Sequence, residues 1–224
     1  MQTFAVIFDM DGIVVDSEPL TIRSYLQAFE EFGVHVPREE YIRRVVVEGS
    51  RVSALFRDSG GDPNLWPDVF GRKTEMYVRL VQTEMRMMPG AMELLADLKR
   101  SAIPCALGTS AARPTMNIVF ERFGLFQYFD VTVTLDEVSS HKPDPEVFLK
   151  AADLLQMPPG RCVVIEDAPK GIFAAKAAGM RCVAVPTCLT VNEDLSAADL
   201  VVESLEQLDA KSLRSLLAAD GKMP

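Results

Sequence analysis

Residues 4–12 read FAVIFDMDG, and this stretch decides the fold. It is a short apolar run, rich in β-branched and aromatic residues, that stops at two acids, which is typical of a buried strand in a parallel sheet. Open α/β sheets bind ligands at the carboxyl ends of their strands, which is where Asp9 and Asp11 fall. Because alternate residues of a strand point the same way, extended backbone would aim both acids at one spot. Gly12 then allows a sharp turn.

Two carboxylates at one spot repel each other unless a divalent cation neutralises them or one of them holds a proton. A metal-bound Asp9 would stay ionised and could act as a nucleophile, and Asp11 could carry a proton to and from a leaving group. The alternative is a solvated acidic turn, because a D-x-D pair is a short motif with many false matches. The rest of the chain has to decide between these two interpretations.

Composition narrows the class of protein. The chain has 224 residues, of which 48% are hydrophobic and 25% charged, as in ordinary globular proteins. A net charge of -9 argues against nucleic acid and acidic membrane surfaces as partners. No apolar run could span a bilayer, the first strand leaves no room for a signal peptide, and the four cysteines form no C-x-x-C pair. We expect a reduced cytoplasmic protein, monomeric, with no membrane or nucleic-acid partner.

The order of predicted elements defines two domains. Residues 17–84 contain apolar residues at helical spacing, interrupted at residues 60–63, and no convincing strand. We interpret them as an all-helical insertion. Residues 1–16 and 85–224 alternate short apolar strands with helices of about ten residues, which predicts an α/β domain of Rossmann-like type with a parallel sheet covered by helices on both faces.

Polar side chains follow four of the predicted strands, and the carboxyl ends of parallel strands meet at one edge of a sheet. These residues are Asp9 and Asp11, Thr109 and Ser110, Lys142, and Glu166 and Asp167. Each has a simpler explanation, since Thr109 and Ser110 could cap a helix and Lys142 could be a solvated loop residue. Together they favour a phosphate site, because carboxylates suit Mg²⁺ and a hydroxyl with a lysine suits a phosphoryl group.

Four segments of the chain resemble, in order and spacing, the motifs of the haloacid dehalogenase-like (HAD) superfamily. They are DMDG at residues 9–12, Thr109, KPDP at residues 142–145 and the pair Glu166-Asp167. The helical insertion resembles the C1 cap of the subgroup that contains β-phosphoglucomutase, phosphoglycolate phosphatase and sugar-phosphate phosphatases. The resemblance implies a Mg²⁺-dependent phosphatase with a core domain at 1–16 and 85–224, a cap at 17–84, and a small phosphorylated metabolite as substrate.

The resemblance also implies a role for each matching residue. Asp9 would attack phosphorus and form an aspartyl-phosphate, and Asp11 would protonate the leaving oxygen and then activate water. Thr109, with Ser110 beside it, and Lys142 would bind the phosphoryl oxygens. Dehalogenases of this family typically lack the second acid, so Asp11 argues against dehalogenation.

The same resemblance implies a Mg²⁺ site. Its ligands would be the carboxylates of Asp9 and Asp167 and the backbone carbonyl of Asp11, with Glu166 close by. These are hard oxygen ligands of the kind that Mg²⁺ prefers.

Two cap segments are similar to those that contact the sugar phosphate in β-phosphoglucomutase. They are Gly49-Ser50-Arg51 and Arg72-Lys73. Arg51 and Lys73 are therefore candidate substrate anchors, the alternative being exposed cations on helix faces.

Hydrolysis and mutase chemistry both remain open. Mutases of this type carry a histidine early in the first cap helix, where this chain has Thr21, and its histidines are His35 and His141. The missing histidine favours a phosphatase over a mutase. A catalytically silent binding module is a third interpretation, against which the retention of both Asp9 and Asp11 argues.

Overall fold

The structure is a computed structural model that describes residues 4–48 and 50–218. The chain divides into two compact units. Met1–Asp16 and Arg86–Pro224 form the first, which we call the core unit, and Ser17–Met85 form the second, the helical unit. The helical unit contains no strand among its described residues.

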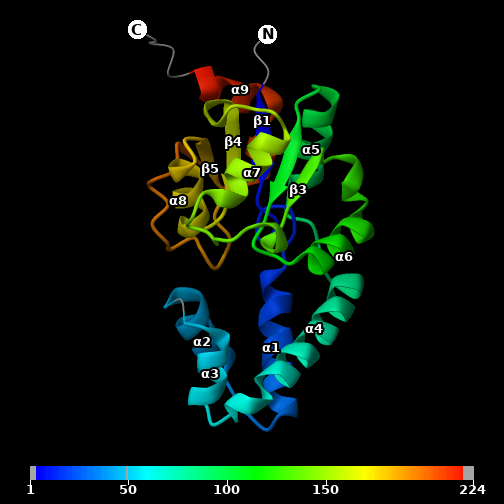
Figure 1. Cartoon of the computed structure of the whole chain (residues 1–224), viewed down its shortest axis with the longest axis vertical. Coiled ribbons are helices and arrows are strands. Elements are labelled where there is room, and N and C mark those ends of the chain that lie inside the picture. The colour runs from blue at the N-terminus through cyan, green and yellow to red at the C-terminus, as the bar shows by residue number, and fades with distance from the viewer. Residues whose placement is uncertain (1–3, 49, 219–224) are drawn as a thin grey trace. The chain divides into compact units, whose positions relative to one another are not determined.

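The core unit is built on a six-stranded sheet in which every neighbouring pair is parallel (Figure 1). Its strands are β1 (Ala5–Phe8), β2 (Cys105–Gly108), β3 (Val131–Val133), β4 (Cys162–Glu166), β5 (Arg181–Ala184) and β6 (Leu200–Val201). Their spatial order is β3-β2-β1-β4-β5-β6, which confirms the predicted α/β class. The order reverses between β1 and β4, and such a switch point is where open α/β sheets bind ligands.

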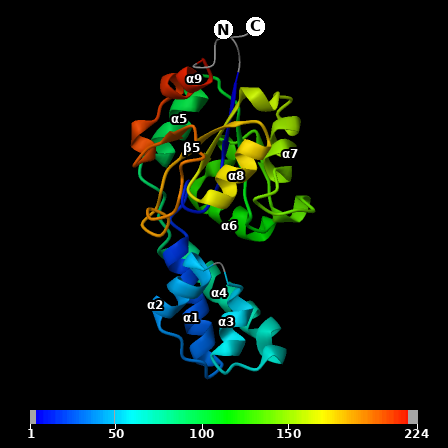
Figure 2. The same ribbon diagram turned by 90° about the vertical axis from the view of Figure 1, so that its left-hand side faces the viewer.

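Helices cover both faces of this sheet. They are α5 (Ala91–Arg100), α6 (Arg113–Phe123), α7 (Glu146–Leu154), α8 (Pro169–Ala177) and α9 (Ala210–Ala218). Right-handed crossovers place α5 and α6 on one face and α7 and α8 on the other. Helix α7 packs beside α8, and α5 beside α9 (Figure 2).

Strand β1 alternates between these two faces, as the period of a strand requires. Ala5 and Ile7 belong to the hydrophobic core that also contains Phe148 of α7 and Ile172 of α8. Phe8 belongs to the opposite face, where its ring centroid lies 5.7 Å from that of Phe129. The next residue on the Ala5 and Ile7 side is Asp9, so its side chain leaves the sheet toward α7 and α8.

The helical unit is held together by aromatic side chains. Its helices are α1 (Glu18–Glu31), α2 (Arg38–Tyr41), which continues into a π-helix (Ile42–Val47), α3 (Val52–Asp58) and α4 (Trp66–Thr83). The rings of Phe29 and Phe56 lie 5.1 Å apart, and those of Tyr25 and Trp66 are stacked at 6.2 Å. The α-helices occur where the apolar spacing predicts helix, whereas the π-helix was not expected.

Short 3₁₀ turns complete the helical elements. They are Pro63–Leu65, Leu125–Gln127, Leu135–Glu137, Pro159–Arg161 and Leu205–Gln207. Over the ranges 4–48 and 50–218, no helix combines the length and the apolar character needed to cross a membrane.

The insertion leaves and re-enters the core unit at a single place. The Asp16 N–H donates to the Arg86 carbonyl and the Met88 N–H to the Val14 carbonyl, both at 3.0 Å. Val15 and Met87 form an antiparallel bridge between the same two segments. Because the two connections pair with each other, the chain re-enters the core unit close to the point at which it leaves it.

Replacement by alanine should change the free energy of unfolding in opposite directions at two glycines. Gly90 precedes α5 with a φ of 81°, and an added Cβ would lie 2.4 Å from the backbone nitrogen of Glu206. Gly71, within α4, has no atom within 4 Å of that position. We expect Gly90→Ala to lower the free energy of unfolding by about 2–4 kcal/mol and Gly71→Ala to raise it by about 0.5–1 kcal/mol. Urea unfolding measures both, and a Gly90→Ala protein of unchanged stability would contradict the described turn.

Candidate active site

The pairing of β1 with β4 brings the first and last acidic motifs together. Phe8 pairs with Ile165, and the Asp9 N–H donates to the Ile165 carbonyl at 3.0 Å. Asp9 and Glu166 therefore stand at the same level of the sheet edge. With Asp167 they form a group whose carboxylate oxygens lie within 4.8 Å of one another. All three residues are buried, so a solvated acidic turn does not describe Asp9.

Lys142 reaches this group from the loop between β3 and α7. Its Nζ lies 2.6 Å from Asp9 Oδ1 and 2.8 Å from Glu166 Oε1, and its side chain is 3% exposed. Burial alone would lower the pKa of Lys142, but the two carboxylates outweigh burial and raise it above its ordinary value. Lys142 is thus a buried cation that bridges two buried acids, not a solvated loop lysine.

The charge balance around Asp9 is incomplete. Burial raises the pKa of Asp9 to about 7, because desolvation outweighs the attraction of Lys142, and the neighbouring charges of Glu166 and Asp11 add to the rise. One ammonium therefore does not supply enough positive charge to keep Asp9 fully ionised near neutral pH. A divalent cation at the same carboxylates would supply the remainder.

Both oxygens of Glu166 already have partners. Oε1 accepts from Lys142, and Oε2 accepts from the backbone N–H groups of Asp167 at 2.9 Å and Ala168 at 3.2 Å. The carboxylate also depends on Gly171, because a Cβ there would lie 1.7 Å from Oε1. Sequence reasoning missed Gly171, although a glycine in the first turn of the helix that follows an acidic strand end was an available signal.

The residues present fit a Mg²⁺ ion. One oxygen from each of three carboxylates lies within 4.8 Å of the others, and these are hard oxygen ligands. The one ammonium at the site, that of Lys142, offsets only one of their three charges. Because both oxygens of Glu166 accept other hydrogen bonds, Glu166 fits a place beside the ion better than a place among its ligands. Asp9 and Asp167 are the carboxylates that could hold the ion directly.

The turn after β1 packs closely against Asp167 and the loop that follows β5. Asp11 lies in this turn, half-buried, and its carboxylate is not part of the three-carboxylate group. Gly12 has a φ of +80°, and an added Cβ would lie 2.5 Å from Asp167 Oδ2 and 3.0 Å from Thr187 Cγ2. Thr187 was not expected at the site, and the residues that directly follow β5, Val185 and Pro186, gave no polar signal for it.

Thr109 and Ser110 follow β2 at the same sheet edge but differ in exposure. Thr109 is buried and its Oγ1 accepts from the Ala111 N–H at 3.0 Å, whereas Ser110 is exposed. Neither is the N-cap of the next helix, because α6 begins at Arg113 with Ala112 as its N-cap. The Thr109 N–H donates to the Val133 carbonyl at 3.0 Å, which ties this loop to the strand that leads into the Lys142 loop.

Arg51 belongs to the helical unit and precedes α3 as its N-cap. It is exposed, and no ion pair of its side chain occurs within the described parts of the chain. Gly49, from the same predicted segment, lies outside the described residues.

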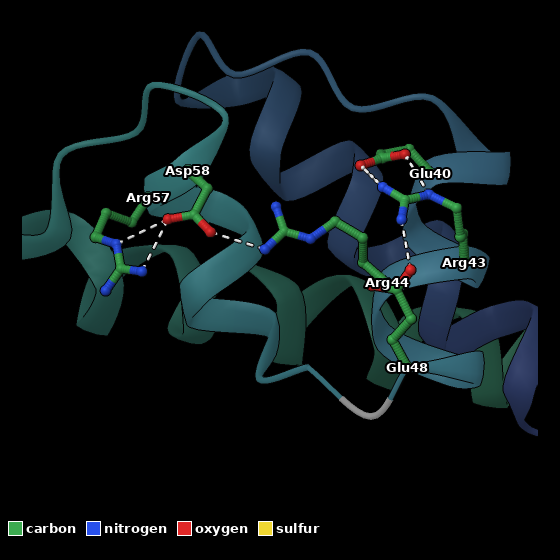
Figure 3. Close-up of polar contacts among 6 residues, drawn as sticks. All are labelled: Glu40, Arg43, Arg44, Glu48, Arg57 and Asp58. Carbon is green, nitrogen blue, oxygen red and sulfur yellow. Dashed lines mark hydrogen bonds and ion pairs between the residues drawn. The ribbon is translucent and has the colours of Figure 1, made fainter.

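Two neighbouring arginines of the π-helix form ion pairs within the helical unit (Figure 3). Arg43 binds Glu40 and Glu48, and Arg44 binds Asp58 at 2.7 Å. These pairs join the π-helix to the start of the following loop and to the end of α3.

Lys73 lies in α4, with its ammonium over two aromatic rings. The distances from Nζ to the ring centroids are 4.9 Å for Tyr25 and 4.5 Å for Tyr77. The quadrupole of an aromatic ring attracts a cation that lies over its face. Lys73 is therefore paired with two rings of the helical unit rather than freely solvated.

Comparison with known proteins gives one consistent family. Residues 6–185 match the family model described as haloacid dehalogenase-like hydrolase. Protein CbbY of Cereibacter sphaeroides is 34% identical over 214 residues, which cover 91% of this chain and 93% of that protein. Hexitol phosphatase B of Escherichia coli (strain K12) is 31% identical over 218 residues, which cover 95% of this chain and 97% of that protein.

Solved structures show the same similarity. A CbbY variant from Rhodobacter sphaeroides in complex with xylulose-(1,5)bisphosphate is 32% identical with a TM-score of 0.82, and the match covers 92% of this chain and 96% of that one. β-Phosphoglucomutase from Clostridium difficile is 26% identical with a TM-score of 0.78, and the match covers 96% of this chain and 97% of that one. The similarity therefore extends over nearly the full length of the chain.

Alanine at Gly171 should displace the Glu166 carboxylate and separate it from Lys142. We expect Gly171→Ala to lower the free energy of unfolding by about 3–5 kcal/mol, because it breaks a buried ion pair. Gly160→Ala is the matched control, since no atom lies within 4 Å of a Cβ there, and its effect should stay within about 0.5 kcal/mol. Urea unfolding compares the two, and equal midpoints would contradict the close contact between Gly171 and Glu166.

Proposed function

Because the chain belongs to the haloacid dehalogenase-like hydrolase family, we propose that it is a Mg²⁺-dependent phosphatase that hydrolyses a small phosphomonoester. One observation carries the proposal: a buried lysine lies 2.6 Å from Asp9 beside a group of three carboxylates. Phosphoryl transfer depends on positioning and on electrostatic stabilisation far more than on covalent chemistry by the protein. A fixed nucleophile, a fixed cation and a cluster of metal-binding oxygens supply both requirements.

Asp9 is the nucleophile in this proposal. Its carboxylate oxygen forms a bond to phosphorus while the bond between phosphorus and the ester oxygen breaks, which leaves an aspartyl-phosphate. Asp11 gives its proton to the departing ester oxygen, so an alcohol leaves. Asp11 then takes a proton from water, whose oxygen bonds to phosphorus as the bond to Asp9 breaks, and inorganic phosphate is released.

Other residues hold the phosphoryl group and balance its charge. Lys142 and Thr109, with Ser110 beside it, bind the phosphoryl oxygens, and Lys142 also offsets the charge of Asp9. The carboxylates of Asp9 and Asp167 and the Asp11 carbonyl would hold Mg²⁺, which would supply positive charge for phosphoryl transfer. Glu166 keeps Lys142 in place from the opposite side.

The substrate in this proposal is a sugar or polyol phosphate. Two relatives support this class, since one is named hexitol phosphatase B and one solved structure contains xylulose-(1,5)bisphosphate. The helical unit acts as the cap, and Arg51 and Lys73 bind the part of the substrate that does not react.

³¹P NMR of the protein with Mg²⁺ and a pool of sugar phosphates tests the proposed reaction. We expect an inorganic phosphate signal that grows, that is lost when the metal is chelated, and that Asp9→Asn abolishes, because the amide is a far weaker nucleophile. The substrate is identified from the signal that shrinks. Isomerisation of a sugar 1-phosphate to the 6-phosphate without free phosphate would instead mean a mutase, and no turnover would favour a silent binding module.

Asp11→Asn should slow two steps, the formation and the breakdown of the aspartyl-phosphate. Loss of a general acid and base typically lowers rates by about 10²–10⁴-fold. Rapid-quench measurement of the phosphoenzyme and of released phosphate separates the two steps. Asp16→Asn is the matched control, because Asp16 is an exposed acid on the same segment, and it should leave both rates unchanged. Normal hydrolysis of the phosphoenzyme in Asp11→Asn would exclude Asp11 as the acid and base.

A further inference from the structure

The loop that carries Lys142 has to be held in place, because its own residues are largely in solvent. His141, Pro143 and Asp144 are exposed, whereas the Lys142 side chain is 3% exposed. Ordering a lysine side chain costs about 2 kcal/mol of conformational entropy, and a shift of its backbone would move the ammonium away from its partners. The position of this backbone is therefore part of the construction of the site.

Helix α7 binds the backbone of this loop through two side chains of opposite charge. The Glu146 carboxylate accepts from the Ser139 N–H at 2.9 and 3.0 Å and from the Ser140 N–H at 2.8 Å. One turn later, the Lys150 ammonium donates to the Glu137 carbonyl at 2.6 Å. Residues four apart lie on the same face of a helix. A carboxylate thus meets backbone donors and an ammonium meets a backbone acceptor along one face.

The same helix also supports the tip of the Lys142 side chain. The Lys142 ammonium lies 4.6 Å from the ring centroid of Phe148, and Phe148 is fully buried in the core. Backbone hydrogen bonds tighten the loop further, since the Asp144 N–H donates to the His141 carbonyl at 2.9 Å. Helix α7 therefore supports Lys142 in two ways, through the backbone of the preceding loop residues and through the ring beneath the ammonium.

We propose that Glu146 and Lys150 are positioning residues that act through Lys142. They fasten residues 137–140 to α7 and so keep the Lys142 ammonium between Asp9 and Glu166. The kinetic consequence rests on the proposed phosphatase function, because Lys142 is there the group that binds the phosphoryl oxygens. The structural consequence, an ordered loop backbone, does not depend on that function.

Amide hydrogen exchange of the wild-type protein and of Glu146→Gln tests the structural consequence. We expect the Ser139 and Ser140 amides to exchange at least tenfold faster in the variant, because charged acceptors form the stronger hydrogen bonds. Glu93→Gln is the matched control, since Glu93 is the acid in the first turn of α5 and forms no hydrogen bond within the described chain. Unchanged exchange at Ser139 and Ser140 in Glu146→Gln would overturn the proposal.

Steady-state kinetics of a double-mutant cycle tests the link to Lys142. We expect Glu146→Gln and Lys150→Met each to lower kcat/KM about tenfold, because small displacements of a catalytic group are costly. In a Lys142→Met background the same changes should have no further effect. Equal losses in both backgrounds would mean a general structural role and would overturn the proposal. If the wild-type protein shows no phosphatase turnover, the proposed function fails, and the exchange experiment still decides whether α7 holds the loop.

Discussion

The candidate site depends on one buried interaction, the contact of the Lys142 ammonium with Asp9 and Glu166. Buried carboxylates are costly unless they are paired, and three of them converge here within 4.8 Å. Lys142 pairs with two of them, and backbone N–H groups stabilise Glu166 further. Burial raises the pKa of Asp9 to about 7, because desolvation outweighs the attraction of Lys142. One ammonium offsets only one of the three carboxylate charges, so the cluster keeps a net negative charge, which favours the binding of a cation.

Packing fixes this electrostatic arrangement as firmly as charge does. The carboxylates of Asp167 and Glu166 occupy the space that a Cβ would need at Gly12 and Gly171. The Glu166 carboxylate is therefore confined between the backbone of Gly171 and its hydrogen-bond partners, and the Asp167 carboxylate packs directly against Gly12. Groups held in this way need little reorganisation when a reaction takes place, which is the main source of electrostatic catalysis in enzymes. A side chain at either glycine would disturb the cluster without changing its charge.

Sequence periodicity was enough to predict the α/β class and to place acids at the ends of the strands that are β1 and β4. Those predictions depend only on strand period and on the shared edge of parallel strands. The burial of Lys142 could not be predicted from neighbouring residues in the sequence. It depends on how its loop packs against α7, the helix that begins at Glu146. Thr187 and Gly171 were missed for a related reason. Their importance comes from close packing against Gly12 and Glu166. A glycine in the first turn after an acidic strand end is a local signal, but it does not specify the contact of Gly171 with Glu166.

The topology explains how a long insertion can follow directly on the first acidic motif without disturbing the cluster. The pairing of Val14–Asp16 with Arg86–Met88 closes the insertion at its base. Asp9 and Glu166 are far apart in sequence but lie side by side in space. The pairing of β1 with β4, in which Phe8 is opposite Ile165, brings them together. The acids of the cluster and Lys142 all belong to the core unit. The length and side chains of Ser17–Met85 can therefore change without moving the cluster, because none of its acids and neither of the strands β1 and β4 lies in that unit.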